Sequence, residues 1–183
     1  MTILHIDSSI TGENSASRAI SARILDRLRA QDPHATVIRR DLVAEPLSHL
    51  TLASFNDQEV LDEFLGADTI VIGAPMYNFT LPTQLKAWLD RILIAGKTFR
   101  YTTHGPEGLA GGKRVIVALA RGGIYDAGSP AAALEHLESY LRGVFSFIGI
   151  DAEFVAADGL NISPEQRDLS IRAALGQTVR LAA

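Results

Sequence analysis

The apolar run Ile70-Val71-Ile72, followed directly by the loop Gly73 to Phe79, is the feature that most restricts the fold. A strand that is apolar on both faces belongs in the middle of a parallel sheet, where helices cover both sides. Ligands of open parallel sheets bind in the crevice beyond the carboxyl ends of the strands. The sequence therefore predicts a central buried strand and a binding loop that follows it.

The side chains of this loop suit a flat, conjugated ligand. Met76, Tyr77 and Phe79 offer polarisable surface, and Asn78 carries two hydrogen-bond donors and an acceptor that can pair with an imide-like ring edge. A packed loop that turns its aromatic side chains into the core is the alternative, and these residues alone leave it open.

Apolar runs alternate with helical patterns five times along the chain, which is typical of a parallel sheet built from strand and helix units. Strands are expected at residues 2–7, 36–41, 68–73, 114–120 and 151–156. Helices are expected at residues 15–30, near 60–64, from 81 to 96, from 129 to 148 (the longest) and from 163 to 181.

Local signals refine these boundaries. Strand 36–41 alternates apolar residues with arginines, which indicates an edge strand. Pro82 is expected in the first turn of its helix, and Ser129-Pro130 is expected to begin the helix 129–148. Ser163-Pro164-Glu165-Gln166 has the form of a capping box. Residues 97–113 are expected to form a long loop, which its length and two aromatic residues mark as functional.

Composition excludes several classes of protein. A chain of 183 residues, 47% of them hydrophobic, suits a single domain spanning 1–183. The net charge of -4 and the scattered basic residues argue against a nucleic-acid partner. The absence of cysteine excludes disulfides and thiolate chemistry, so redox work needs a bound cofactor. No signal-like start or long apolar run is present, so we expect a cytoplasmic protein without membrane contact.

The segment Asp7 to Arg18 is rich in hydroxyl groups and opens a helix, which favours a phosphate site. Unpaired amides and the dipole at a helix N-terminus attract anions, and Ser9, Ser15 and Ser17 can donate further hydrogen bonds. Ordinary N-capping is the alternative, although capping needs one hydroxyl and five are present here. The segment matches neither Gly-x-Gly-x-x-Gly nor the Walker motif, so a monophosphate is the expected ligand.

A third loop, Ala120-Arg121-Gly122-Gly123, ends the apolar strand 114–120 and should lie at the same edge of the sheet. Paired glycines let backbone amides approach a ligand, and such amides can stabilise negative charge on a reduced ring system. A plain turn is the alternative. The five histidines show no metal-ligand spacing and no hydrolase motif occurs, so no metal is expected and His5 is expected to be a satisfied strand residue.

Several motifs together resemble those of the FMN-dependent NADH azoreductases, also described as NADH:quinone oxidoreductases. The resemblance covers the whole chain. It is carried by the segments Ser15 to Arg18, Pro75 to Phe79, Pro82 to Lys86, Lys97 to Tyr101 and Arg121 to Gly123.

This resemblance implies a flavodoxin-like three-layer α/β fold with helices on both faces of a five-stranded parallel sheet of order 2-1-3-4-5. Ser9 and the segment Ser15-Ala16-Ser17 would hold the FMN phosphate. The isoalloxazine ring would lie between the other two loops, whose implied binding residues are Pro75, Met76, Tyr77, Asn78, Phe79, Ala120, Arg121, Gly122 and Gly123. Two departures are that Ala120 replaces a serine found in many members and that the segment between the second and third strands is short.

The implied activity is transfer of a hydride from NADH to FMN, followed by delivery of two electrons to a quinone or azo compound in a ping-pong cycle. Tyr77 and Tyr125 are candidates for stacking or acceptor contact. The alternative is a flavodoxin-type electron carrier or an FMN-bearing regulatory protein. The resemblance also implies a homodimer with flavin sites at its interface, and we expect Tyr140, Phe145 and Phe147 on the helix 129–148 to form the contact.

Overall fold

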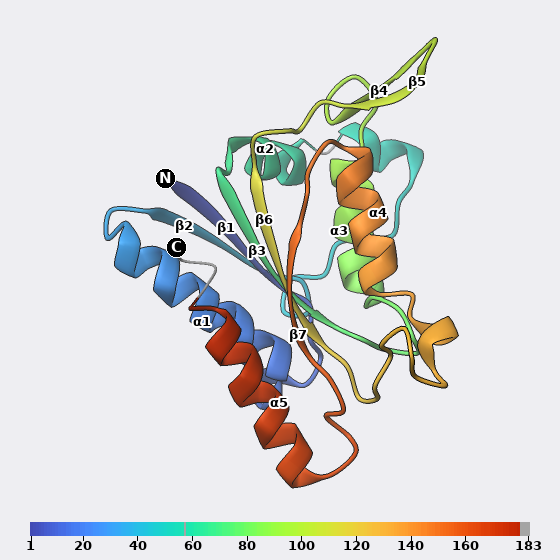
Figure 1. The fold of residues 1–183 in the computed structure, drawn as a ribbon. Coiled ribbons are helices and arrows are strands. Elements are labelled where there is room, and N and C mark those ends of the chain that lie inside the picture. Colours follow the sequence, from blue (N-terminus) through green and yellow to red (C-terminus); the bar gives the residue numbers. More distant parts are fainter. Residues whose placement is uncertain (57, 180–183) are drawn as a thin grey trace.

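A parallel sheet forms the centre of the structure, a computed structural model that describes residues 1–56 and 58–179 (Figure 1). Within these residues the sheet has five strands in the order β2-β1-β3-β6-β7. The strands are β1 (Thr2–Asp7), β2 (Thr36–Asp41), β3 (Thr69–Pro75), β6 (Arg114–Ala120) and β7 (Glu153–Ala157). The expected order is confirmed, because β4 and β5 form a separate hairpin and only shift the numbering.

Burial along the strands follows their place in the sheet. Every residue of β3 is buried, as are the last six residues of β6, and these two strands pair in the middle of the sheet. No residue of β2 is fully buried, and this strand lies at the edge beside β1. The predictions of a central strand and an edge strand are therefore confirmed.

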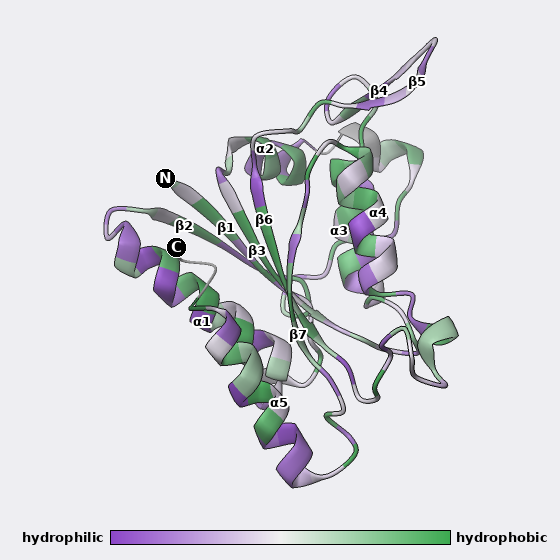
Figure 2. Cartoon of the chain, in the orientation of Figure 1, coloured by the Kyte–Doolittle hydropathy of each residue, from purple (hydrophilic) through white to green (hydrophobic). Residues whose placement is uncertain are grey.

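Helices cover both faces of the sheet. In Figure 1, α1 and α5 lie on one face and α2, α3 and α4 on the other, and each group encloses its own buried apolar cluster. Figure 2 shows hydrophobic residues concentrated in the strands and hydrophilic residues on the outer sides of α1 and α5. The helix bounds are α1 (Ala16–Gln31), α2 (Glu59–Gly66), α3 (Thr83–Ile92), α4 (Glu138–Phe147) and α5 (Pro164–Gln177), with short 3-10 turns at Gly12–Asn14, Leu52–Asn56 and Ala132–Leu134. Among the described residues, no helix has the length and apolar character needed to cross a membrane.

Two helices begin where their capping residues predicted. Ser15 accepts a hydrogen bond from the amide of Arg18 at the start of α1, and Ser163 accepts one from the amide of Gln166 at the start of α5. The side chain of Gln166 donates to Ser170, so only the serine half of the expected capping box forms. The expected end of this last helix, at residue 181, lies outside the described residues.

The expected helix 129–148 is wrong in its first half. The segment after Ser129 forms a 3-10 turn, and α4 begins only at Glu138. The carboxylate of Glu135 accepts hydrogen bonds from the amides of Leu137, Glu138 and Ser139, and thus caps the helix there. The longest described helix is consequently α1, with 16 residues.

The expectation that Phe145 faces a partner subunit is also wrong. Its side chain is fully buried, because Leu137, Leu141 and Phe145 follow one another at helical spacing and pack together in the core. Tyr140 and Phe147 are partly buried and pack against the same core. These aromatic residues therefore complete the fold of this chain.

Residues 97–113, expected as a loop, contain a β-hairpin that projects from the body of the protein (Figure 1). Its strands are β4 (Phe99–Thr102) and β5 (Gly105–Gly108), paired antiparallel. Phe99 packs against Phe147 at the base with 4.7 Å between ring centroids, whereas Tyr101 is 75% exposed. The hairpin is thus anchored at its base and presents an aromatic ring outward.

Candidate functional site

A cavity of about 290 Å³ opens beyond the carboxyl ends of the strands, as the sheet topology predicted. The loops after β1, β3, β6 and β7 form its walls. Eight of the residues expected to bind a cofactor line it: Ser9, Ser15, Ala16, Pro75, Met76, Tyr77, Ala120 and Gly122. Thr11, Asn14, Leu160, Asn161 and Arg167 also line it and were not anticipated.

The N-terminus of α1 forms the part of the cavity lining whose hydrogen-bond donors suit a phosphate. The hydroxyl groups of Ser15 and Ser17 lie 3.0 Å apart, and both residues are buried. Ser15 lines the cavity, whereas Ser17 lies behind it. Hydroxyl groups and unpaired helix amides therefore meet at one end of the cavity, which is the donor set that a phosphate requires.

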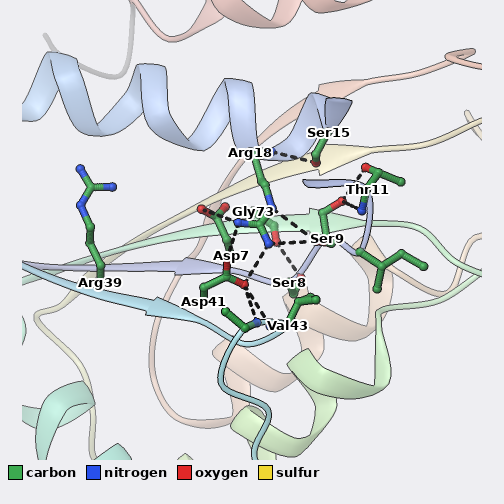
Figure 3. Close-up of polar contacts among 12 residues, drawn as sticks. Asp7, Ser8, Ser9, Thr11, Ser15, Arg18, Arg39, Asp41, Val43 and Gly73 are labelled. Carbon is green, nitrogen blue, oxygen red and sulfur yellow. Dashed lines mark hydrogen bonds and ion pairs between the residues drawn. The ribbon is translucent and has the colours of Figure 1, made fainter. Parts of the chain in front are cut away.

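Arg18 fixes the loop after β1 from outside the cavity (Figure 3). Its guanidinium forms a bidentate pair with Asp41 at 2.7 and 2.9 Å and donates to the carbonyl oxygen of Ser9 at 2.9 Å. The hydrogen bond from Arg18 lowers the pKa of Asp41 to about 2. Ser8 adds a hydrogen bond from its hydroxyl to the carbonyl of Gly73, which ties this loop to β3.

Further buried polar residues, on β1 and α1, are hydrogen-bonded next to Arg18. The hydroxyl of Ser21 donates to Asp7 and lies 3.1 Å from Nε2 of His5. Burial lowers the pKa of His5, against the attraction of the Asp7 carboxylate. A Cβ atom at Gly73 would lie 2.6 Å from Asp7 Oδ1, so a larger residue there would displace this carboxylate from its hydrogen bond with Ser21. His5 is thus a hydrogen-bonded strand residue, as expected.

The loop after β3 is a tight turn with unusual backbone geometry. Tyr77 and Thr80 exchange two backbone hydrogen bonds, and Asn78 and Phe79 between them have positive φ angles of 49° and 72°. Such angles are rare for a bulky residue such as Phe79 and are typical of functional turns. Asn78 lines a neighbouring cavity of about 590 Å³, and Phe79 is 44% exposed.

Tyr77 links two walls of the site. Its phenolic oxygen accepts a hydrogen bond from the amide of Ile10 at 3.1 Å and lies 3.2 Å from the hydroxyl of Ser9. Tyr77 and Met76 line both the smaller and the larger cavity, so the two spaces share this wall. Tyr77 therefore positions the loop after β1 as well as offering an aromatic face.

The side chain of Arg121 is 6% exposed and is enclosed by acidic groups. It forms ion pairs with Asp158 at 2.5 Å, Glu138 at 3.3 Å and Glu135 at 3.6 Å. Burial acts to lower the pKa of Arg121, but these carboxylates outweigh it and raise the pKa. The guanidinium therefore holds the loop after β6 against α4 and the loop after β7.

The loop after β7 supplies the wall that the sequence did not reveal. The amides of Leu160 and Asn161 donate to the carbonyls of Arg121 and Gly122, and a Cβ atom at Gly122 would lie 2.5 Å from Asn161 Nδ2. The ring of Tyr125 lies beside Gly123, and neither residue lines the smaller cavity. The signal available in the sequence was topological, since β7 ends at the same edge as the other strands.

The donor set fits a phosphate-bearing cofactor with a flat ring. Hydroxyl groups and the N-terminus of α1 line part of the cavity, and Met76, Tyr77, Ala120 and Gly122 also line it. Polarisable side chains and close backbone are the surfaces that a conjugated ring packs against. One cavity therefore offers surfaces for both the phosphate and the ring of a ligand.

Comparison with known proteins supports this interpretation. A family model described as "Flavodoxin-like fold" matches residues 1–181. An FMN-dependent NADH:quinone oxidoreductase 2 of Bradyrhizobium diazoefficiens is 53% identical, with 100% of each chain covered. An FMN-dependent NADH:quinone oxidoreductase of Sinorhizobium fredii is 55% identical over 93% of this chain and 92% of its own. The crystal structure of an azoreductase from Bacillus anthracis superposes with a TM-score of 0.90, at 29% identity, over 100% of this chain and 98% of that chain.

Proposed function

The chain belongs to the family with the flavodoxin-like fold, and from this premise we propose that it is an FMN-dependent NADH:quinone oxidoreductase that also reduces azo compounds. The observation that carries the proposal is the cavity at the carboxyl ends of the strands, which is lined by phosphate donors and by aromatic and backbone surfaces. Relatives with this activity share about half of their residues with the chain along nearly its whole length.

Bound FMN supplies the redox chemistry that carries a hydride from NADH to the acceptor. We assign the phosphate to Ser9, Ser15, Ala16 and Ser17, around the start of α1. Replacing Ser15 and Ser17 together by alanine should weaken FMN binding, because charge-assisted hydrogen bonds contribute about 1.5–3 kcal/mol each. Unchanged FMN affinity in an equilibrium titration would remove the phosphate from this end of the cavity.

We assign the ring to the two facing loops, residues 75–79 and 120–123. The amide of Met76 donates to the carbonyl of Ala120 at 2.8 Å, so these loops are fixed to one another. Arg121 contributes by holding its loop in place, since its side chain is enclosed by carboxylates. The backbone of Gly122 and Gly123 can approach the ring and stabilise negative charge on its reduced form.

An assay with NADH and a small quinone tests the activity. The flavin-loaded protein should oxidise NADH rapidly, whereas a flavodoxin-type electron carrier would not. Because Met76 and Tyr77 line both cavities, we expect NADH and the acceptor to occupy the space beside these residues in turn. Parallel double-reciprocal plots are then expected, and intersecting lines would show a ternary complex instead.

We also propose that residues 1–183 form one domain that acts as a homodimer. The motive is exposed apolar surface around the site, where Ile10 is 60% exposed, Phe79 44% and Leu134 43%. A second subunit over these residues would exclude water from the flavin. Phe79→Asp should lower both the sedimentation coefficient and the activity, while Leu169→Asp, on an exposed position of α5, should change neither. A fully active monomer would contradict the proposal.

A further inference from the structure

Arg167, on the first turns of α5, reaches the cofactor cavity from a helix distant in sequence from the other phosphate ligands. Its side chain is half-buried, and Nη2 donates a hydrogen bond to the carbonyl oxygen of Asn14 at 2.9 Å. Asn14 directly precedes Ser15, the N-cap of α1. The guanidinium is therefore fixed next to the hydroxyl groups and helix amides that receive the phosphate.

The charge of Arg167 distinguishes it from every other described residue that lines the smaller cavity, since the rest are neutral. The other arginines near the site face carboxylates, Arg18 with Asp41 and Arg121 with Asp158. Within residues 1–56 and 58–179, no carboxylate lies within ion-pair distance of Arg167. Its side chain thus brings to the lining of the cavity a positive charge that no described carboxylate pairs with.

We propose that Arg167 is a cofactor-binding residue whose guanidinium pairs with the phosphate of FMN, an inference that rests on the proposed function. A guanidinium has five N–H donors, and the bond to Asn14 uses one of them. A phosphate monoester carries about 1.5 to 2 negative charges near neutral pH, which hydroxyl groups and helix amides alone do not neutralise. Arginine supplies that charge with a geometry suited to phosphate oxygens.

The contact also explains how α5 takes part in the site. Arg167 connects α5 to the loop before α1, and the loop leading into α5 adds Leu160 and Asn161 to the lining of the same cavity. The C-terminal part of the fold therefore contributes to the cavity through both a helix and the loop before it.

The test compares Arg167→Gln with Arg172→Gln in the full-length protein. Glutamine keeps an amide that can donate to Asn14 but removes the charge. Arg172 lies on the same helix, its side chain is 75% exposed, and it pairs with Asp168, so its variant controls for a general loss of charge. Binding of FMN and of riboflavin, which lacks the phosphate, is measured by quenching of flavin fluorescence at several salt concentrations.

We expect Arg167→Gln to weaken FMN binding by about tenfold or more, as for loss of a charge-assisted hydrogen bond, and to leave riboflavin binding unchanged. The salt dependence of FMN affinity should also become shallower, since one charged contact is missing. Arg167→Lys should restore part of the affinity and of the salt dependence. Arg172→Gln should match the wild type in all of these measurements.

Two results would overturn the inference. Equal weakening of FMN and riboflavin, with an unchanged salt dependence, would show that Arg167 only anchors the loop at Asn14. Unchanged FMN affinity in Arg167→Gln would show that Arg167 does not pair with the phosphate. If the wild-type protein bound no FMN at all, the proposed function itself would fail, and this outcome is distinct from the other two.

Discussion

Two arginines each hold a loop of the site in place, but they differ in how deeply they are buried and in their ion-pair partners. Arg18 ties the loop after β1 to Asp41 at the end of β2, and Arg121 ties the loop after β6 to Asp158 beyond the end of β7. Each therefore joins a binding loop to the neighbouring strand on its outer side. The side chain of Arg18 is 20% exposed, whereas that of Arg121 is 6% exposed.

The partners of the two arginines differ as well. Arg18 forms a bidentate pair with Asp41 and a longer ion pair with Asp7 at 3.8 Å, and it donates to the carbonyl of Ser9, so it acts directly on a loop that lines the cavity. Arg121 is buried among three carboxylates, and its removal would leave these acids facing one another. A buried charge that loses its partner is strongly destabilising. We infer that Arg121 mainly maintains the fold and Arg18 mainly maintains the shape of the binding loop.

The largest effect is expected from Arg121→Met, which removes the charge and keeps much of the side-chain length. The free energy of unfolding should fall by about 3–5 kcal/mol, the usual cost of breaking a buried ion pair. Urea denaturation followed by circular dichroism measures it. Arg142→Gln is the matched control, because it removes a half-exposed arginine from Glu138 in the same cluster and from the ring of Phe154, and it should cost about 1 kcal/mol. Similar urea midpoints for the two variants would contradict the comparison.

A smaller loss of stability is expected from Arg18→Gln, about 1 kcal/mol, because Asp41 is partly exposed and solvent screens the pair. FMN affinity should fall together with stability, since the loop carrying Ser9 loses its anchor. Compared with Arg121→Met, Arg18→Gln should lose more FMN affinity for each kcal/mol of unfolding free energy that it loses. Equal FMN affinity in Arg18→Gln and the wild type would show that the loop keeps its shape without Arg18.

The ion pair between Arg18 and Asp41 predicts that stability depends on pH in the acid range. Arg18 lowers the pKa of Asp41 in the folded protein to about 2, below its usual value of 3.8. The stabilisation is therefore present above about pH 4 and is lost as the pH falls toward 2. In Arg18→Gln, this part of the acid destabilisation should disappear. Urea midpoints of both proteins between pH 5 and pH 2 should converge toward the acid end, and a constant gap would contradict the assignment.

The elements that the sequence predicted well are those with a strong local signal. The apolar runs of β3 and β6 and the Ser15 cap of α1 all appear in the structure within one or two residues of their expected positions. Burial on both faces and helix capping are properties of short segments, so the pattern alone reveals them. Eight of the expected binding residues meet in one cavity for the same reason, since strand ends share one edge.

The elements that the sequence did not predict depend on distant contacts. Ser129-Pro130 resembles a helix start, but the carboxylate of Glu135 caps α4 instead, and this depends on where the turn places that side chain. The prediction that Phe145 points outward was wrong, because Phe145 lies on the same buried face as Leu137 and Leu141. Asn161 lies on the loop after β7, so only the shared edge of the strands could have indicated it. Arg167 reaches the cavity from α5, which packs against α1, and no local pattern shows this.

The smallest expected effect is a change in the free energy of unfolding between about pH 7 and 5. Of the two arginine clusters, only the one around Arg18 contains the histidine that would cause it. There His5 lies among Asp7, Ser21, Arg18 and Arg39, and Asp26 also acts on it. The groups that form ion pairs with Arg121 are the carboxylates of Asp158, Glu138 and Glu135, and no histidine is among them.

Burial lowers the pKa of folded His5 below its ordinary value of 6.5, so the unfolded chain takes up a proton first as the pH falls. The stabilisation by neutral His5 is thus present above about pH 6.5 and declines below it, by at most about 1.4 kcal/mol per pH unit for one proton. His5→Gln should flatten the plot of the free energy of unfolding against pH in this window, while His34→Asn, at an exposed position, should leave the slope unchanged. Because the hydroxyl of Ser21 joins His5 to Asp7, a slope that persists in His5→Gln would assign the titration to another group and remove this difference between the two arginine clusters.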